Sequence, residues 1–175
     1  NSTSGTRAEE TLALIRGARE HGVDVTTEAY PYTAGASLIE SPLFDNWENR
    51  VTSAYRTLQW VNTGERLTPE TFTAYRQEGG WVIMHGRPES TNEWIVSQSD
   101  VIVASDGIPF SAGRAHPRGA GTFSRVLGHY VRDRGALSLI DAIRKMTVLP
   151  AQRLETVVPE MKQKGRIQVG SDADL

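Results

Sequence analysis

Apolar residues along the chain alternate between helical spacing and short continuous runs. The first helical stretch has apolar side chains three or four positions apart, at Ala8, Leu12, Ile15 and Ala18. This spacing predicts an amphipathic helix that opens with the capping-box sequence Thr6-Arg7-Ala8-Glu9 and ends at Gly22. Residues 23–30, rich in Val and Thr, then predict a strand that Pro31 closes.

The central part of the chain continues the alternation. Residues 31–42 are expected to form a loop, and the apolar spacing within 43–64 favours a helix. Thr68-Pro69-Glu70 is typical of a helix start and Gly79-Gly80 of a helix end. The apolar run 81–84 predicts a buried strand.

The last third of the chain contains one more predicted strand. Its apolar run is 101–104, after a helix that opens at Pro88. A loop rich in Gly, Pro and Arg follows at 107–121. Two helices and a short helical turn come next, beginning at Phe123, Ser138 and Pro150. The second of these helices carries Leu139, Ile140, Ile143 and Met146, and Ser138 with Asp141 predicts its cap.

Short apolar strands separated by helices are typical of an α/β protein with a parallel sheet covered on both faces. Two architectures fit this order, a β/α barrel and an open doubly wound sheet. No Gly-rich phosphate-binding fingerprint follows any predicted strand. Its absence removes the commonest nucleotide-binding reason for an open sheet.

Composition narrows the expected surroundings. A chain of 175 residues is long enough for one domain with a sizeable core, and its net charge of -2 gives no reason to expect nucleic acid or an anionic membrane as partner. Cysteine is absent, which fits a reducing compartment, so a cytoplasmic location is expected. The loop-like start and the strand that begins at Gly165 lead us to expect neighbouring sequence at both ends.

Polar residues follow three of the predicted strands, where ligands of parallel α/β sheets bind. The three exits are Thr27-Glu28-Ala29-Tyr30-Pro31-Tyr32, Met84-His85-Gly86-Arg87 and Ala104-Ser105-Asp106-Gly107. Asp106 directly follows a buried apolar run, where an unpaired carboxylate is costly and a metal ion or a reacting water would compensate it. Asp-Gly is also a common turn sequence, so Asp106 equally fits a turn former or a helix cap.

Each of the other candidate site residues also fits two interpretations. His85 fits a metal ligand, a proton shuttle or a substrate contact, and it fits a histidine hydrogen-bonded at the rim of a barrel. Glu28 fits a metal-side carboxylate or the partner of a nearby arginine. Arg118 or Arg114, in the long loop after Asp106, suits a bidentate grip on a carboxylate, unless this loop is simply solvated.

Six segments of the chain, in this order, resemble those of a known family: residues 25–35, 103–107, 116–128, 142–147, 165–167 and 173–175. Together they resemble the D-aminoacylase and N-acyl-D-amino-acid deacylase branch of the amidohydrolase superfamily. Ser105-Asp106-Gly107 is common in proteins, whereas the run from His116 followed by Arg144-Lys145-Met146-Thr147 is specific.

The resemblance implies the C-terminal portion of a (β/α)8 TIM-type barrel, incomplete and containing about its last three strands. Residues 1–164 would belong to the barrel, and residues 165–175 would begin a return strand to a small β-sandwich. We expect the isolated segment to fold poorly and to associate, because an incomplete barrel leaves sheet edges open.

The resemblance also implies a zinc-activated water that attacks an amide carbonyl. Asp106 would accept the proton of this water and pass it to the leaving amine, and Asp106 and Glu28 would be the metal ligands from this chain. The implied substrate contacts are Tyr32, His85, Arg87, Ser105, His116 and Arg118. Most zinc ligands of the family, including its His-x-His pair, would precede Asn1, and no histidine occupies the exit after the strand at 23–30.

The expected activity is therefore hydrolysis of the non-peptide amide of an N-acyl-D-amino acid by the full enzyme, with the isolated segment inactive. A cyclic amide hydrolase of the dihydroorotase or hydantoinase kind is one alternative. A catalytically inactive fragment or binding module is another. The expected partners are the small-molecule substrate, the remainder of the same chain and a further copy of the enzyme, and neither nucleic acid nor membrane is expected.

Overall fold

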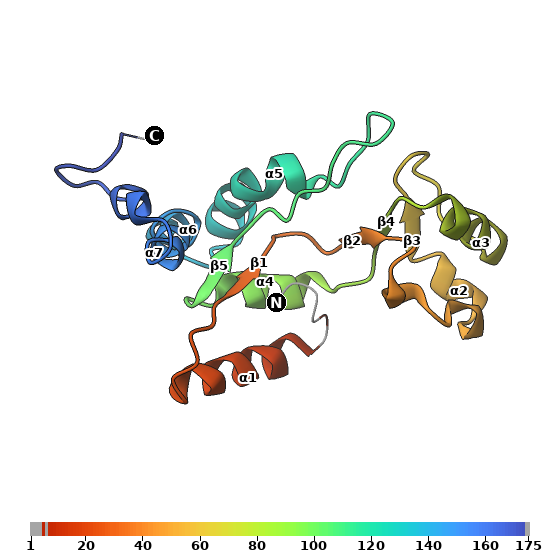
Figure 1. Cartoon of the computed structure of the whole chain (residues 1–175), viewed down its shortest axis with the longest axis horizontal. Helices are drawn as coiled ribbons and strands as arrows, with labels where there is room; N and C mark the ends of the chain where they lie inside the picture. Colours follow the sequence, from red (N-terminus) through yellow and green to blue (C-terminus); the bar gives the residue numbers. More distant parts are fainter. Residues whose placement is uncertain (1–4, 6, 174–175) are drawn as a thin grey trace.

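The computed structural model describes residue 5 and residues 7–173, and Figure 1 shows an elongated arrangement of two small sheets with helices packed on them. Thr6, in the predicted capping box, and the last two residues of the predicted return strand lie outside the described residues. Within the described part, no helix combines the length and apolar character needed to cross a membrane.

The helical elements of the described chain run from one end to the other. In chain order they are α1 (Ala8–Glu20), η2 (Pro42–Phe44), η3 (Trp47–Asn49), α2 (Thr52–Tyr55), α3 (Pro69–Glu78), α4 (Glu89–Ser97), α5 (Arg118–Arg125), the π-helical η4 (Val126–Asp133), α6 (Leu139–Met146), α7 (Val148–Leu154) and η5 (Pro159–Gln163). The predicted helices α1, α3, α4 and α6 are confirmed, and α3 begins with the expected Thr68 cap.

Two of the predicted strands form a parallel pair. β1 (Thr27–Ala29) lies beside β5 (Val101–Val103) in register from Thr27 with Val101 to Ala29 with Val103. The parallel pairing is as predicted, although β1 begins later than the predicted start at residue 23. A parallel pair places the carboxyl ends of both strands at the same edge, so the residues after Ala29 and Val103 emerge together.

Helices cover one face of this pair. Leu12 of α1 and Ile95 of α4 pack against Ala29 and Val101, while Val103 packs against η4 and α6. The alternation of side chains puts Glu28 on the opposite face, where its side chain is exposed. Ile102, on the same face as Glu28, is buried with 6% of its surface exposed.

The second sheet is antiparallel and was not predicted. Its order is β2 (Gly35–Leu38), β4 (Trp81–Met84), β3 (Leu58–Trp60), with both outer strands antiparallel to β4. β4 was expected as a strand of the parallel sheet, β2 was expected to be loop, and the helix expected within 43–64 is wrong at β3. β2 and β3 carry little apolar alternation of their own, and they form strands because β4 offers each of them an edge to pair with.

An aromatic core holds this second sheet to α2 and α3. Its fully buried side chains include Trp60, Leu58 and Val82, and Phe72 of α3 stacks on Trp47 with ring centres 5.7 Å apart. Apolar burial of this kind is the main stabilising contribution to a small unit. The segment from β2 to β4, between the two strands of the parallel pair, thus packs around a core of its own.

The C-terminal part departs from the prediction in three places. α5 begins at Arg118, inside the stretch expected to be loop. α6 buries Ala142 and Lys145 and leaves Ile140 73% exposed, because the Lys145 ammonium donates to the Val96 and Gln98 carbonyls at the end of α4. Residues 165–173 form no strand, and the side chains of Ile167 and Val169 are fully exposed. The predicted β-sandwich stays a prediction.

Candidate active site

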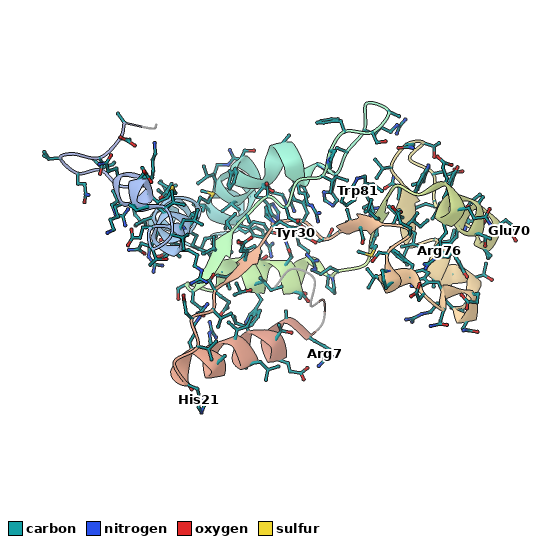
Figure 2. All side chains as sticks on the ribbon, in the orientation of Figure 1. Arg7, His21, Tyr30, Glu70, Arg76 and Trp81 are labelled. Carbon is teal, nitrogen blue, oxygen red and sulfur yellow. The ribbon has the colours of Figure 1, made fainter. Side chains whose placement is uncertain are left out.

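The three polar strand exits meet around one pocket of about 360 Å³. Tyr30, which leaves β1 toward β2, lies in the centre of the molecule (Figure 2). The pocket is lined by Gly5, Tyr30, Thr33, Gly35, Ala36, Leu43, Met84, His85, Gly86, Arg87, Pro88 and Asp106. The exit of β4 thus joins the other two although β4 belongs to the antiparallel sheet, because β2 carries the chain directly from the β1 exit to β4.

Asp106 has an unusual backbone conformation at the end of β5. Its φ angle is 48°, in the left-handed region that aspartate tolerates better than most residues. Its side chain is 59% exposed and pairs with the Arg118 guanidinium, with 2.9 Å between Oδ2 and Nη2. A Cβ atom on Gly107 would lie 3.2 Å from the Cα atom of Gly119, so the β5 exit and the start of α5 touch backbone to backbone. Strained conformations of this kind cluster at functional sites.

Arg118 is almost fully buried, with 2% of its side chain exposed. Its Cζ atom lies 4.5 Å from the centre of the Tyr30 ring, a favourable cation–π distance. Its Nε and Nη1 atoms have no hydrogen-bond partner among the described residues. Buried donors are rarely left unpaired, so these two nitrogens need a partner that the described residues do not supply.

His116 is held as a neutral ring beside Arg118. Its Nε2 atom donates to the Ala34 carbonyl at 3.1 Å, and its Nδ1 atom accepts from the Arg118 amide at 3.1 Å, which requires a single proton on Nε2. Burial, together with the charge of Arg118, lowers the pKa of His116 to about 4. His116 therefore positions the first residue of α5 and does not carry charge at neutral pH.

Arg87 is committed to the turn after β1. Its Nη1 atom donates to the Tyr32 carbonyl at 2.8 Å and its Nη2 atom to the Tyr30 hydroxyl at 3.2 Å. Both ends of its fork are therefore occupied by protein. Of Arg87 and Arg118, both predicted to contact the substrate, only Arg118 has an Nη atom without a partner among the described residues, so the geometry favours Arg118 for the substrate carboxylate.

The other predicted substrate contacts lie at different depths. The His85 Nε2 atom is 2.9 Å from Oε1 of Gln59, and burial, with a smaller contribution from the charge of Arg66, lowers the pKa of this histidine. Ser105 is half-buried beside Asp106. The Tyr32 ring meets His116 edge-on at 5.6 Å, and its hydroxyl lies so close to α5 that a Cβ atom on Gly121 would overlap it. Tyr32 thus packs behind the pocket wall.

The predicted metal ligands Asp106 and Glu28 are not part of a larger donor cluster. Among residues 5 and 7–173, no group of three or more His, Asp or Glu side chains forms a metal site, and cysteine is absent. Glu28 is in register with Ile102, whereas Asp106 follows the end of β5. A four-coordinate zinc ion would need most of its ligands from elsewhere, and the role of both carboxylates stays a prediction.

Tyr30 and Asn92 were missed by the sequence analysis. Tyr30 is 4% exposed and its ring lies near the guanidinium groups of both Arg87 and Arg118. Asn92 is fully buried on α4, and in one orientation of its amide it bonds to the Tyr30 carbonyl at 3.2 Å and the Tyr32 amide at 3.3 Å. Tyr30 stands at a strand exit before a proline, a signal that was available. Nothing in the sequence distinguishes Asn92 from a surface helix residue.

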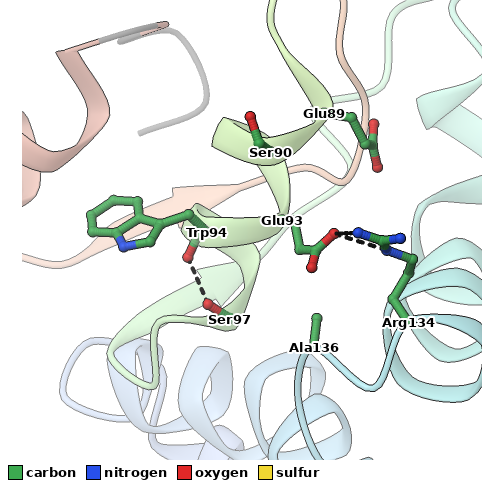
Figure 3. A pocket seen from close by; sticks show the side chains of 7 residues that line it. All are labelled: Glu89, Ser90, Glu93, Trp94, Ser97, Arg134 and Ala136. Carbon is green, nitrogen blue, oxygen red and sulfur yellow. Dashed lines mark hydrogen bonds and ion pairs between the residues drawn. The ribbon is translucent and has the colours of Figure 1, made fainter.

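A second pocket, of about 390 Å³, lies on the surface of α4 (Figure 3). It is lined by Glu89, Ser90, Glu93, Trp94, Ser97, Arg134 and Ala136. The ion pair between Glu93 and Arg134, at 2.8 Å, satisfies the main charges within it. None of the three strand exits reaches this pocket, so the candidate active site is the pocket beside Asp106.

Comparison with known proteins points to the family that the sequence suggested. No family model matches the chain. The chain is 34% identical to a D-aminoacylase and 32% identical to an N-acyl-D-glutamate deacylase, both from Alcaligenes xylosoxydans xylosoxydans. Each similarity covers 97% of the chain and 35% of the relative, so the chain spans about a third of the length of these relatives.

Comparison with solved structures points to the same deacylases. A D-aminoacylase crystal structure, described as defining a novel subset of amidohydrolases, matches with a TM-score of 0.72 at 32% identity, covering 99% of the chain and 37% of that structure. The N-acyl-D-glutamate deacylase of Bordetella bronchiseptica, solved with zinc and a phosphonate mimic of the tetrahedral intermediate, matches with a TM-score of 0.76 at 29% identity, covering 97% of the chain and 36% of that structure. The predicted resemblance is confirmed: over nearly its whole length, the chain is similar to one third of the D-aminoacylases and N-acyl-D-amino-acid deacylases of the amidohydrolase superfamily.

Proposed function

We propose that the chain is a segment of a metal-dependent hydrolase that cleaves the amide of an N-acyl-D-amino acid to a carboxylate and a free D-amino acid. The observation that carries the proposal is the exposed carboxylate of Asp106, paired with a buried arginine at the wall of a pocket. The confirmed similarity to deacylases supports the same reaction class.

Within this reaction Asp106 holds and moves the proton. Its carboxylate accepts a proton from the attacking water and donates it to the nitrogen of the leaving amine. The exposure of Asp106 toward the pocket suits this transfer, and its ion pair with Arg118 orients the carboxylate. Zinc, when bound through ligands outside the described residues, would activate the water and polarise the carbonyl.

Arg118 binds the substrate carboxylate in this proposal. Its Nε and Nη1 atoms have no partner among the described residues, so each can donate one charge-assisted hydrogen bond to an anion. Arg87 and His116 hold the residues around it. His85 and Met84 line the pocket wall beside them and contribute to the choice of acyl group or side chain.

The proposed architecture is the C-terminal part of a (β/α)8 barrel. Two observations support it: β1 and β5 are parallel neighbours, and their helices lie on one face, as in the wall of a barrel. Glu28, on the opposite face, would then point into the barrel. A cytoplasmic location remains a proposal from the composition.

The proposal is tested by turnover with the full-length enzyme that contains this segment. N-acetyl-D-amino acids, their L counterparts and hydantoins are offered in the presence of zinc. Release of free amine is measured for the first two, and formation of the N-carbamoyl amino acid for the hydantoins. D-selective release supports the deacylase, whereas ring opening of hydantoins alone points to a cyclic amide hydrolase. Absence of turnover together with absence of bound metal would instead support an inactive binding module.

A further inference from the structure

A second polar cluster joins α4 to α5 and η4, and it converges on one atom. Oε1 of Glu89 accepts from Nη2 of Arg125 at 3.2 Å, from Nε2 of His129 at 3.1 Å and from the Tyr130 hydroxyl at 2.6 Å. An acidic residue in the first turn of a helix is favoured by the helix dipole without any such partners. The helix dipole alone therefore does not explain why three donors from α5 and η4 converge on one oxygen of Glu89.

Arg125 connects this cluster to the candidate active site. Its Nε atom donates to the Pro31 carbonyl at 2.6 Å, in the turn after β1, while Nη2 of the same guanidinium is held by Glu89. The guanidinium also lies 5.3 Å from the centre of the Tyr32 ring. The guanidinium of Arg125 thus links the Glu89 carboxylate directly to the backbone between Tyr30 and Tyr32.

The turn from Tyr30 to Tyr32 supports the groups proposed to act on substrate. The Tyr30 ring lies beneath the Arg118 guanidinium at 4.5 Å, and the Tyr32 ring meets His116 at 5.6 Å. Arg118 in turn pairs with Asp106. A shift of this turn would therefore move Arg118, and with it the carboxylate of Asp106.

We propose that Glu89 is a positioning residue for the hydrolytic site. It orients Arg125 and, through Arg125, the Tyr30–Pro31–Tyr32 turn on which Arg118 and His116 rest. The expected effect of Glu89 on catalysis rests on the proposed function, whereas its expected effect on the position of the turn rests on the contacts alone. Glu89 touches none of the predicted reacting groups in the described chain, so its effect on catalysis is indirect.

Glu93 provides a matched control one turn further along α4. It carries the same charge, lies in the same outer pocket and pairs with Arg134, as Figure 3 shows. Its ion-pair partner, Arg134, directly follows η4, and among the described residues it makes no hydrogen bond to the turn after β1. Replacing Glu93 thus removes a comparable ion pair on the same helix without touching Arg125.

The experiment compares Glu89→Gln with Glu93→Gln in the full-length enzyme. With an N-acetyl-D-amino acid we expect kcat/KM of E89Q to fall about tenfold to a hundredfold, because a mispositioned site loses transition-state contacts. E93Q should stay within about twofold of the wild type, because its partner Arg134, unlike Arg125, makes no hydrogen bond to the turn after β1 among the described residues. Arg125→Lys combined with E89Q should cost no more than the larger single change, because both act through one contact.

Crystal structures of the two variants supply a readout that does not depend on activity. Residues 30–32 should shift in E89Q and superpose on the wild type in E93Q. Equal kinetics of the two variants, additive effects of E89Q and R125K, or an unmoved turn in E89Q would each overturn the inference. If the wild-type enzyme turned over no N-acyl-D-amino acid, the proposed function would fail, and the position of the turn alone would decide the role of Glu89.

Discussion

The carboxylate of Asp106 and the guanidinium of Arg118 meet at 2.9 Å, one group mostly exposed and the other buried. Twelve sequence positions separate them, yet the close approach of Gly107 and Gly119 brings the end of β5 against the start of α5. The pair is therefore a consequence of backbone packing. The negative charge of Asp106 faces the pocket, whereas the positive charge of Arg118 is held in place by burial.

Replacing Asp106 with Asn should abolish most of the activity. The amide is nearly the same size but cannot accept and return a proton, so kcat should fall at least about a hundredfold, within the usual range for loss of a general acid–base. Steady-state kinetics with N-acetyl-D-amino acids measure the change. Asp133→Asn, which removes an exposed carboxylate paired with Arg132, is the control and should leave kcat unchanged. Full turnover by D106N would remove Asp106 from the mechanism.

Arg118 and Arg87 should differ in kinetics. Arg118→Lys keeps the charge but loses the unpaired Nε and Nη1 donors of the planar guanidinium, so we expect KM to rise about tenfold or more, the value of one charge-assisted hydrogen bond. Arg87→Lys should chiefly lower the melting temperature, because the Arg87 fork is already bound to Tyr30 and Tyr32. A larger increase in KM for R87K than for R118K would reverse the assignment of the carboxylate site.

Gly107 should tolerate a side chain less well than Gly119. A methyl group on Gly107 would lie 3.2 Å from the backbone of Gly119, whereas one on Gly119 would make an ordinary contact at 3.8 Å. We expect Gly107→Ala to cost about 1–3 kcal/mol of unfolding free energy through overpacking and to lower activity. Gly119→Ala should be close to wild type in both. Urea unfolding of the full-length enzyme measures the difference, and equal values would show that the two backbones separate easily.

The neutral state of His116 should make folding sensitive to acid. Below pH 6.5 the unfolded chain binds a proton on this ring, whereas the folded chain binds it only near pH 4, so stability falls as the pH is lowered through this window. The loss is at most about 3 kcal/mol, and less to the extent that solvent reaches the ring.

The variant His116→Gln isolates this effect. Its unfolding free energy should depend less on pH between 6.5 and 4 than that of the wild type. Parallel slopes for H116Q and the wild type would show that the ring is already protonated in the folded chain at pH 6.

The sequence by itself determined the helices with strong end signals and the two strands of the parallel pair. Thr68 and Ser138 cap their helices as predicted, because a side-chain oxygen at a helix start acts locally. The apolar run at Val101–Val103 is a strand because continuous Val and Ile residues suit a buried parallel strand. These features depend on neighbouring residues, and Asp106 could be chosen as a candidate for the same reason.

Only the tertiary structure decided the second sheet and the partners of the site. β2 and β3 exist because β4 pairs with them, and no local pattern in their short sequences predicts this pairing. Arg118 meets Asp106, and Arg125 joins Glu89 to Pro31, across long sequence separations. Such contacts form only when the helices pack on the parallel pair. Their energies come from burial and from charge pairing between segments, and the sequence of one segment does not reveal either.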